Sequence, residues 1–307
     1  MNNRIATMLD IPYIRLHFEL EMEEDSILSV NKASALRGGM GQMLLRSCCV
    51  ADRDCDQCRF RKDCIVQRIM YSPFAIKPPF VTGGESIGFV LDCEDFRKVY
   101  YKGEILPFEM TLFGGTVVFF YQILEAFSML GREGLGKDHT HFTVRSVTNT
   151  QRQALVLGSD IDMGRYDIHT LNDYVIYRMR TGIKNTRMKF HSPVAIKFMG
   201  DQIRQFDPEP VITSLCRRIY MLDCYEGIEV PQYDPSGKFP LMTGQQVENI
   251  HTARYSTSHK EKIHLKGIKG YMDLENIDDE IYTLLLAGEI THIGSNTKFG
   301  FGRYTLL

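Results

Sequence analysis

The chain has 307 residues, which suits two ordinary domains or one large one, and 44% are hydrophobic, so it can bury a proper core. The formal net charge is −2, which argues against a general polyanion binder, because such domains tend to be basic. We see no apolar run long enough to predict a membrane span, and no apolar core of a signal peptide at the N-terminus. We therefore expect a cytoplasmic protein whose eight cysteines do not form a disulfide framework.

The first half of the chain begins with a strand pattern and a helix pattern. Residues 11–21 alternate apolar and polar side chains, the period of a half-buried strand, and include His17. Residues 34–49 are typical of a glycine-rich turn that leads into an amphipathic helix, with Arg37 beside the first glycine. Free backbone N–H groups at such a turn could hold a phosphate.

Five cysteines lie directly after this predicted helix. Cys49, Cys55, Cys58 and Cys64 fall within about sixteen residues, and Cys48 is an alternative first ligand. Four thiolates could surround one Zn²⁺ tetrahedrally or hold an iron–sulfur cluster, and the remaining alternative is a set of reduced thiols without metal. We favour a structural zinc ion, because four cysteines leave no open coordination position. A redox protein built on an iron–sulfur cluster is the more distant alternative.

The remaining elements of the first half complete a familiar order. Residues 115–130 are apolar nearly all round, which predicts a buried helix. Strand patterns occupy residues 86–92, 106–113 and 140–147. The resulting order, β-α-β-β-α-β, is that of the ferredoxin-like unit, which also underlies RNA-recognition modules.

The second half repeats this order of elements without a detectable sequence repeat. We predict a strand over residues 188–198, a helix over 208–225, a hairpin over 262–274, a helix over 278–287 and a terminal strand–loop–strand over 290–307. A basic cluster precedes and overlaps the first of these strands: Arg178, Arg180, Lys184, Arg187 and Lys189. The sequence thus predicts an α+β protein of two tandem ferredoxin-like domains, 1–150 and 151–307, with a small cysteine-rich insertion at 48–64.

The last eighteen residues hold a glycine-rich loop with Gly294, Gly300 and Gly302, flanked by Lys298 and Arg303. Glycines let backbone N–H groups approach a polyanion, and the two cations could hold phosphates. The loop is neither a phosphate-binding loop of nucleotide hydrolases, since GxxxxGK[ST] is absent, nor a dinucleotide fingerprint, since it leads into a strand.

A basic run over residues 254–270 precedes this loop, with five Lys or Arg against one Glu. The two stretches together resemble the C-terminal signature of the CRISPR-associated repeat-cleaving endoribonucleases of the RAMP superfamily. The matching residues are Arg254, Tyr255, Ser256, Lys260, Lys262, Gly267, Gly270, His292, Gly294, Thr297, Phe299, Gly300, Gly302 and Tyr304. The glycine-rich helix start and the cysteines after it also resemble segments of this family.

The resemblance implies metal-independent cleavage of CRISPR repeat RNA by attack of a ribose 2′-OH on the adjacent phosphate. Members of the family often carry a helix histidine where this chain has Gln42, so another group must take the proton. His292 is the first candidate because a histidine titrates near neutrality. We expect Tyr255 and Lys260 to share the catalytic role, and the reserves are His251, His259 and His17.

The same resemblance suggests which residues contact repeat RNA or crRNA. We expect Arg37, Arg254, Lys262, Gly294, Lys298, Gly300, Gly302 and Arg303 to bind it. Phe299 and Phe301 could stack on bases or could equally belong to the core. The alternative function is a non-cleaving RNA-binding subunit of a CRISPR effector complex. Other effector subunits are therefore possible partners, and no membrane is expected.

Overall fold

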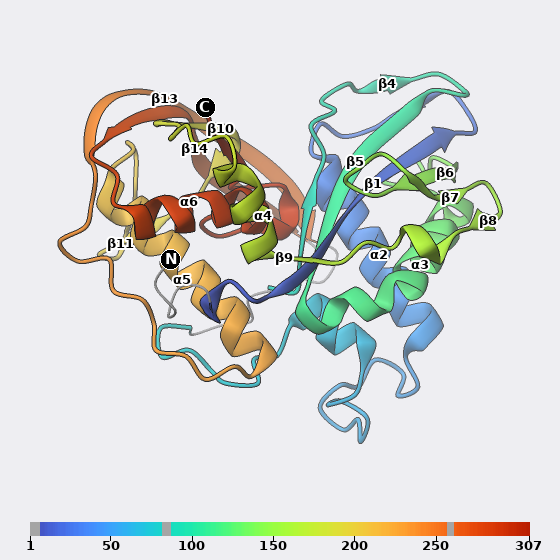
Figure 1. Ribbon diagram of the computed structural model, residues 1–307. Coiled ribbons are helices and arrows are strands. Elements are labelled where there is room, and N and C mark those ends of the chain that lie inside the picture. The colour runs from blue at the N-terminus through green and yellow to red at the C-terminus, as the bar shows by residue number, and fades with distance from the viewer. Residues whose placement is uncertain (1–6, 82–86, 257–260) are drawn as a thin grey trace. The chain divides into compact units, whose positions relative to one another are not determined.

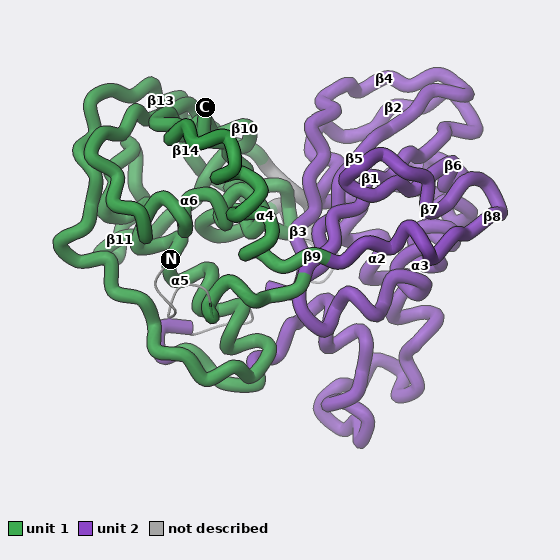
Figure 2. The backbone as a smooth tube through the Cα atoms, in the orientation of Figure 1, with its two compact units in different colours: residues 1–12, 75–78, 169–307 green, residues 13–74, 79–168 purple. Residues whose placement is uncertain are grey.

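The computed structural model describes residues 7–81, 87–256 and 261–307, and of residues 253–262 no side chain is described. The chain forms two compact units (Figure 2). Residues 13–74 and 79–168 make up the N-terminal unit, and residues 1–12, 75–78 and 169–307 make up the C-terminal unit. Each unit has its own sheet and its own helices.

The N-terminal unit is a ferredoxin-like fold. Its sheet has the strand order β3-β5-β1-β6-β7-β8, in which β1 lies antiparallel between β5 and β6. Figure 1 shows α2 and α3 beside this sheet. The elements are β1 (Pro12–Met22), β2 (Ser26–Ile27), α2 (Lys32–Cys48), a π-helical turn (Gln67–Tyr71), β3 (Phe89–Asp92), β4 (Val99–Tyr100), β5 (Ile105–Phe113), a 3-10 turn (Gly114–Phe119), α3 (Phe120–Glu133), β6 (Phe142–Thr148), β7 (Ala154–Leu157), β8 (Asp160–Ile161) and a second 3-10 turn (Met163–Arg165).

The C-terminal unit repeats the same topology. Its four-stranded sheet has the order β13-β14-β10-β15, the ferredoxin-like order of second, third, first and fourth strand. The fold class predicted from the sequence is therefore confirmed. The elements are β9 (His169–Thr170), α4 (Leu171–Met179), β10 (Arg187–Val194), β11 (Lys197–Phe198), β12 (Asp201–Gln202), α5 (Pro208–Glu226), β13 (Leu241–Ser256), β14 (Glu261–Glu275), α6 (Asp279–Thr291), a 3-10 turn (Thr297–Phe299) and β15 (Tyr304–Leu306).

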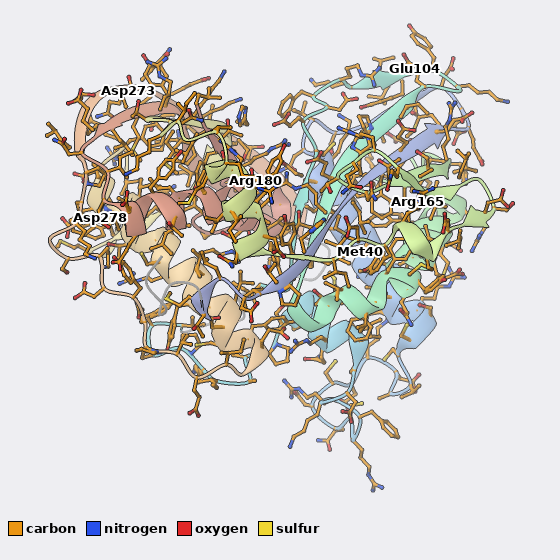
Figure 3. All side chains as sticks on the ribbon, in the orientation of Figure 1. Met40, Glu104, Arg165, Arg180, Asp273 and Asp278 are labelled. Atoms are coloured by element: carbon orange, nitrogen blue, oxygen red, sulfur yellow. The ribbon has the colours of Figure 1, made fainter. Side chains whose placement is uncertain are left out.

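Helix α2 begins earlier than the sequence predicted. Its N-cap is Asn31, whose side chain accepts a hydrogen bond from the Ser34 N–H, so the glycines from position 38 onward lie inside the helix. The predicted phosphate-binding turn is therefore wrong, because the amides there belong to a helix interior. These glycines serve packing instead: a Cβ on Gly39 would lie 2.5 Å from Leu130 of α3, and one on Gly41 2.4 Å from Met70. Met40, labelled in Figure 3, lies fully buried on the same helix.

The apolar segment predicted as one buried helix is a 3-10 turn followed by α3. By length and composition alone, residues 114–133 could cross a membrane, but 56% of the apolar 18-residue stretch within them is buried inside the structure. Phe127 of α3 packs against Phe18 of β1 and Phe108 of β5, with ring centroids 5.3 and 5.0 Å apart. This segment therefore has the burial of a core helix that covers a sheet.

Two element predictions in the C-terminal half are wrong. The residues predicted as a hairpin, 262–274, form most of the single strand β14, which pairs along its whole length with β13. Helix α6 runs on to Thr291 and includes residues that were expected to start the last strand. The first error arose because the long edge strand β13 shows no clear alternation, so its pairing with β14 was not recognised.

The helices of the C-terminal unit cover one face of its sheet. Phe190 of β10 stacks on Phe206 at 4.7 Å between ring centroids and contacts Tyr304 of β15 at 5.6 Å. The Tyr304 hydroxyl donates to the Leu285 carbonyl of α6 at 2.6 Å, and a Cβ on Gly288 would lie 2.0 Å from that hydroxyl. Helix α6 therefore covers one face of the sheet. The alternate residues along each strand point to the opposite face.

Candidate nucleic-acid interface

A row of polar and aromatic side chains lies on the face of the C-terminal sheet that points away from α6. Lys189 of β10 is exposed and pairs in register with Tyr271 of β14 on one side and Thr305 of β15 on the other. Residues directly opposite in antiparallel strands share a face, so the three side chains stand beside one another. We call Arg187, Lys189, His191, Tyr271 and Thr305 the open-face row.

Tyr271 is held in place by its neighbours in this row. The Arg187 guanidinium lies 4.0 Å from the centre of the Tyr271 ring. It also donates two hydrogen bonds, of 2.7 and 2.9 Å, to the carboxylate of Asp273, which Figure 3 labels on β14. This fork fixes the guanidinium plane over the ring. The result is an aromatic ring on a sheet face beside an exposed lysine, a combination that suits base stacking and phosphate contact.

His191 and Arg303 continue the row toward the glycine-rich loop. The His191 ring Nε2 lies 2.8 Å from Thr305 Oγ1, and the His191 N–H donates to the Arg303 carbonyl at 2.9 Å. The Arg303 N–H in turn donates to Ser192 Oγ at 2.9 Å. Arg303, half-buried, alternates with the buried residues of β15. The predicted RNA contact of Arg303 stays a prediction, and the structure places this residue at the edge of the open-face row.

The sequence singled out the glycines of the terminal loop but predicted another role for them. A Cβ on Gly294 would lie 2.5 Å from the Ala195 carbonyl oxygen, and one on Gly302 would lie 2.0 Å from that of Ile293. Both glycines have positive φ angles, of 77° and 79°. The Gly302 N–H donates to the Pro193 carbonyl at 2.8 Å. These two glycines let the loop press against its own protein, so their local role is packing.

Two aromatic side chains of the loop point inward. Phe299 is 6% exposed and Phe301 3% exposed, and they pack with Ala195 and Leu265 in a small buried cluster. Of the two expectations, RNA platform or core, the structure supports the core. The cluster has a further consequence, because Leu265 belongs to β14. The cluster joins the glycine-rich loop to β14, and so it brings together the two stretches that carry the family resemblance, the basic run and the terminal loop.

His292 lies at the C-cap of α6, with a positive φ of 57°. Its side chain is 2% exposed, and its ring Nδ1 lies 3.3 Å from the Phe301 carbonyl oxygen. This is the geometry of a histidine that supports the loop backbone. The predicted catalytic role stays a prediction, but such burial leaves the ring little access to an RNA substrate.

The described residues of the basic run, 254–256 and 261–270, belong to β13 and β14. Of the predicted site residues, Lys260 and the side chains of Arg254, Tyr255 and Lys262 lie outside the described part of the structure, as does His259. His251 and Lys266 stand opposite each other in register, and both are exposed. Lys266 therefore places an exposed cation directly after Leu265, which belongs to the buried cluster of Phe299 and Phe301 in the glycine-rich loop.

Three other predicted contact residues have defined surroundings. Arg37 is half-buried on α2 and donates to the Met70 carbonyl at 3.4 Å, which ties the helix to the π-helical turn. Lys298 is half-buried, and its ammonium lies 5.6 Å from the centre of the Phe299 ring. Gly300 has a positive φ of 83° and ends the short 3-10 turn. Their contacts with RNA stay predictions.

The five cysteines at the end of α2 and in the segment after it line a single cavity of about 270 Å³. Among the described residues, however, no three His, Cys, Asp or Glu side chains are placed so that they could hold a metal ion. That Cys49, Cys55, Cys58 and Cys64 surround one metal ion stays a prediction. The identity of any bound metal is a separate question, and zinc stays a prediction.

Sequence reasoning missed the open-face row as a site. It grouped Arg187 and Lys189 with Arg178 in one basic cluster, whereas Arg178 forms an ion pair with the buried Glu289. The alternation of Arg187, Lys189 and His191 with buried residues along β10 was the available signal. Tyr271 could not be added from sequence, because its place beside Lys189 depends on the register between β10 and β14.

Two family models match the chain. One, described as an N-terminal domain, matches residues 11–167, and the other, described as CRISPR-associated endoribonuclease Cas6, matches residues 188–304. The second match contains Lys189, His191 and Tyr271 of the open-face row, and it contains the glycine-rich loop. No match was found among curated proteins.

Solved structures with the same fold include several Cas6 proteins. The chain resembles a Cas6 product complex (18% identity, TM-score 0.54, covering 96% of this chain and 99% of the other). It also resembles Thermus thermophilus Cas6 (12%, TM-score 0.52, 97% and 99%). A third similar structure is a partial Cas6-RT-Cas1–Cas2 complex (12% identity, TM-score 0.57). The match covers 97% of this chain but only 46% of the chain in that complex.

The two family models account for nearly the whole chain, one for each half. The structural likenesses show that the Cas6 proteins share its fold. The chain therefore belongs, over residues 11–167, to the family of that N-terminal domain, and its residues 188–304 match the model of CRISPR-associated endoribonuclease Cas6.

Proposed function

We propose that this protein binds CRISPR repeat RNA and cleaves it as an endoribonuclease. The family match over residues 188–304 supports the RNA class and the reaction class. The observation that carries the proposal is the open-face row, in which exposed Lys189 stands beside Tyr271 on the sheet face that points away from α6. Single-stranded RNA is commonly bound by stacking bases on such aromatic rings while cations track the phosphates.

The cleavage that we propose needs no metal ion. The ribose 2′-oxygen attacks the adjacent phosphorus, and the bond from phosphorus to the 5′-oxygen of the next nucleotide breaks. The products are a 2′,3′-cyclic phosphate and a 5′-OH end, and the proton of the 2′-OH ends on the leaving oxygen. General acid–base catalysis contributes about 10²–10⁴-fold to such a step, and fixed cations stabilise the additional phosphate charge.

We propose that His292 supports the loop and that a more accessible histidine transfers the proton. His251 is exposed on β13 in the Cas6-matched half. His17 is half-buried in the middle of β1, where burial lowers its pKa below the usual value. A histidine with a lowered pKa is neutral at neutral pH, so its ring can accept a proton. Tyr255 and Lys260 stay candidates from the sequence.

The test is cleavage of a labelled repeat RNA in the presence of EDTA, with the chemistry of the product ends determined. We expect a cyclic phosphate and a 5′-OH end. The variants His251→Ala and His17→Ala identify the proton acceptor by the loss of the chemical step at saturating RNA. Binding without product would instead make the protein a non-cleaving subunit, which the replacement of a helix histidine by Gln42 also allows.

Partners follow from the same family. We propose that the protein works with other CRISPR proteins, because a Cas6 within a Cas6-RT-Cas1–Cas2 complex shares its fold. Copurification of tagged protein with its CRISPR neighbours, before and after ribonuclease treatment, measures this. Association that survives ribonuclease supports direct contact, and loss of all association shows that crRNA bridges the proteins. We propose a cytoplasmic location for this work.

A further inference from the structure

The cavity at the end of α2 measures about 270 Å³ and is lined by five possible thiolate ligands. Its walls include all five cysteines of the segment and the apolar side chains of Leu45, Val50, Phe60, Ile65 and Val66. Cys48 ends α2 and Cys49 is its C-cap, whereas Cys64 lies at the start of the next helical segment. The thiols thus reach the cavity from both ends of a sixteen-residue loop and from its middle.

The space between these thiols is larger than a single zinc ion fills, because the cavity measures about 270 Å³. Zinc binds each thiolate at about 2.3 Å, so four tetrahedral sulfurs lie only about 3.8 Å apart. The five cysteines line this one space, and among the described residues no three His, Cys, Asp or Glu side chains gather around a single ion position. In an iron–sulfur cluster each thiolate binds a different iron atom, so the sulfurs surround a larger core.

A second observation concerns Cys49. The backbone N–H of Arg53 donates to Cys49 Sγ at 3.3 Å. Asp52 and Arg53 both have positive φ angles at this position, of 46° and 68°. Two consecutive non-glycine residues in this region cost conformational energy, and such strain is found at functional sites. Backbone N–H groups that donate to ligand sulfur are a regular feature of iron–sulfur sites, where they tune the reduction potential.

We propose that Cys49, Cys55, Cys58 and Cys64 hold an iron–sulfur cluster with several irons in this cavity. Cys48 is the spare thiol: its Sγ lies 3.3 Å from Ser47 Oγ, and it packs partly against the core of the N-terminal unit. The apolar walls of the cavity limit the access of water to the cluster. Because its ligands come from both ends of the loop, the cluster fastens residues 49–64 to the unit.

The experiment measures metal and sulfide in protein that is purified without oxygen and reconstituted with ferrous iron and sulfide. We expect iron and acid-labile sulfide bound in similar amounts, with the visible absorbance of an iron–sulfur cluster. One zinc per chain without sulfide overturns the proposal in favour of the mononuclear site. Binding of neither metal after reconstitution overturns it as well.

Variants assign the ligands. Cys55→Ser and Cys58→Ser are expected to lose iron and sulfide together, whereas Cys93→Ser, a half-buried thiol of the same unit outside the cavity, retains both. Cys48→Ser is expected to retain the cluster and Cys49→Ser to lose it. The reverse result for this pair would overturn the assignment of the first ligand.

Proteolysis gives a readout that is independent of colour and of RNA. Arg53, Arg59, Arg61 and Lys62 are exposed in the loop and are cleavage sites for trypsin. With the cluster bound, the fastened loop is expected to resist trypsin, and the Cys58→Ser variant is expected to be cut within the loop. Equal cleavage of the two proteins would show that the thiols fasten nothing. None of these outcomes depends on RNA cleavage.

Discussion

Arg178 of α4 and Glu289 of α6 form an ion pair that also holds the last strand of the C-terminal unit. The Arg178 Nη1 donates to Glu289 Oε2, and its Nη2 donates to the Leu306 carbonyl at 3.2 Å. Glu289 Oε1 accepts the Leu306 N–H at 2.7 Å, and Oε2 accepts the Tyr174 hydroxyl at 2.9 Å. Glu289 is 3% exposed, so this carboxylate depends on its partners.

Removal of Arg178 alone is expected to be costly. Arg178→Met leaves a buried carboxylate without its cation, which lowers the free energy of unfolding by about 3–5 kcal/mol. The double variant Arg178→Met with Glu289→Gln removes the unpaired buried charge and keeps an acceptor for the Leu306 N–H. We therefore expect it to recover much of the free energy of unfolding that Arg178→Met loses. Urea unfolding of the wild type, both single variants and the double variant measures this coupling. Additive effects would mean that the ion pair contributes little.

The terminal loop tests the packing role of its glycines. Gly302→Ala places a Cβ 2.0 Å from the Ile293 carbonyl oxygen at a φ of 79°. The matched control is Gly182→Ala, with a φ of 67° and nothing within 4 Å of its Cβ, so it carries only the backbone cost of about 1–2 kcal/mol. We expect Gly302→Ala to destabilise the protein clearly more than this control in urea unfolding. Equal losses would show that the close approach does not matter.

A buried carboxyl in α5 makes the stability depend on pH. Asp223 is fully buried, and among the described residues neither of its carboxyl oxygens has a hydrogen-bond partner. Burial raises the pKa of Asp223 from 3.8 to about 8. Between these two values the unfolded chain has lost the proton that the folded protein keeps. The free energy of unfolding therefore falls as pH rises, by about 1.4 kcal/mol per pH unit.

The variant Asp223→Asn removes this titration and imitates the protonated acid. We expect its stability to change less between pH ~5 and ~8 than that of the wild type. Thermal unfolding across this range provides the measurement. Glu275→Gln, which changes an exposed carboxylate, is the control and should keep the wild-type slope. A wild-type slope in Asp223→Asn would show that another group sets the pH dependence.

The open-face row predicts how RNA affinity depends on salt. Lys189→Gln removes one phosphate contact, so binding of repeat RNA weakens and the slope of log K against log salt falls by about 0.7–0.9. Lys184→Gln is the control, because Lys184 pairs with Asp279 at the start of α6. Fluorescence anisotropy at several salt concentrations measures both variants. An unchanged salt slope for Lys189→Gln would show that RNA phosphates do not contact this face of the sheet.

Aromatic stacking is tested separately at Tyr271. Tyr271→Leu removes the ring beside Lys189 and is expected to cost ~1–3 kcal/mol of RNA binding if one base stacks there. Tyr271→Phe keeps the ring and should bind almost as the wild type does. Tyr271→Leu with wild-type affinity would exclude this residue as a platform. The salt slope should stay unchanged in both variants, because no charge is lost.

The order of elements could be predicted from sequence because it depends on local patterns. Residues 11–21 alternate in polarity, and the apolar stripe of α5 recurs at helical spacing, so both segments were assigned correctly. The β-α-β-β-α-β order then indicated the ferredoxin-like units, which the sheet orders confirm. The glycine-rich loop and its basic neighbour also identified the family, because such motifs are local.

The candidate site depended on contacts that local patterns do not contain. Phe299 and Phe301 could face RNA or the core, and only the position of Leu265 on β14 decided for the core. Gly302 marked a close approach, but the sequence could not say that the approaching atoms belong to Ile293. The sequence alone determined the ferredoxin-like order of the elements and indicated the family. The tertiary structure decided which side chains share a surface, because strand register and burial join residues that are distant along the chain.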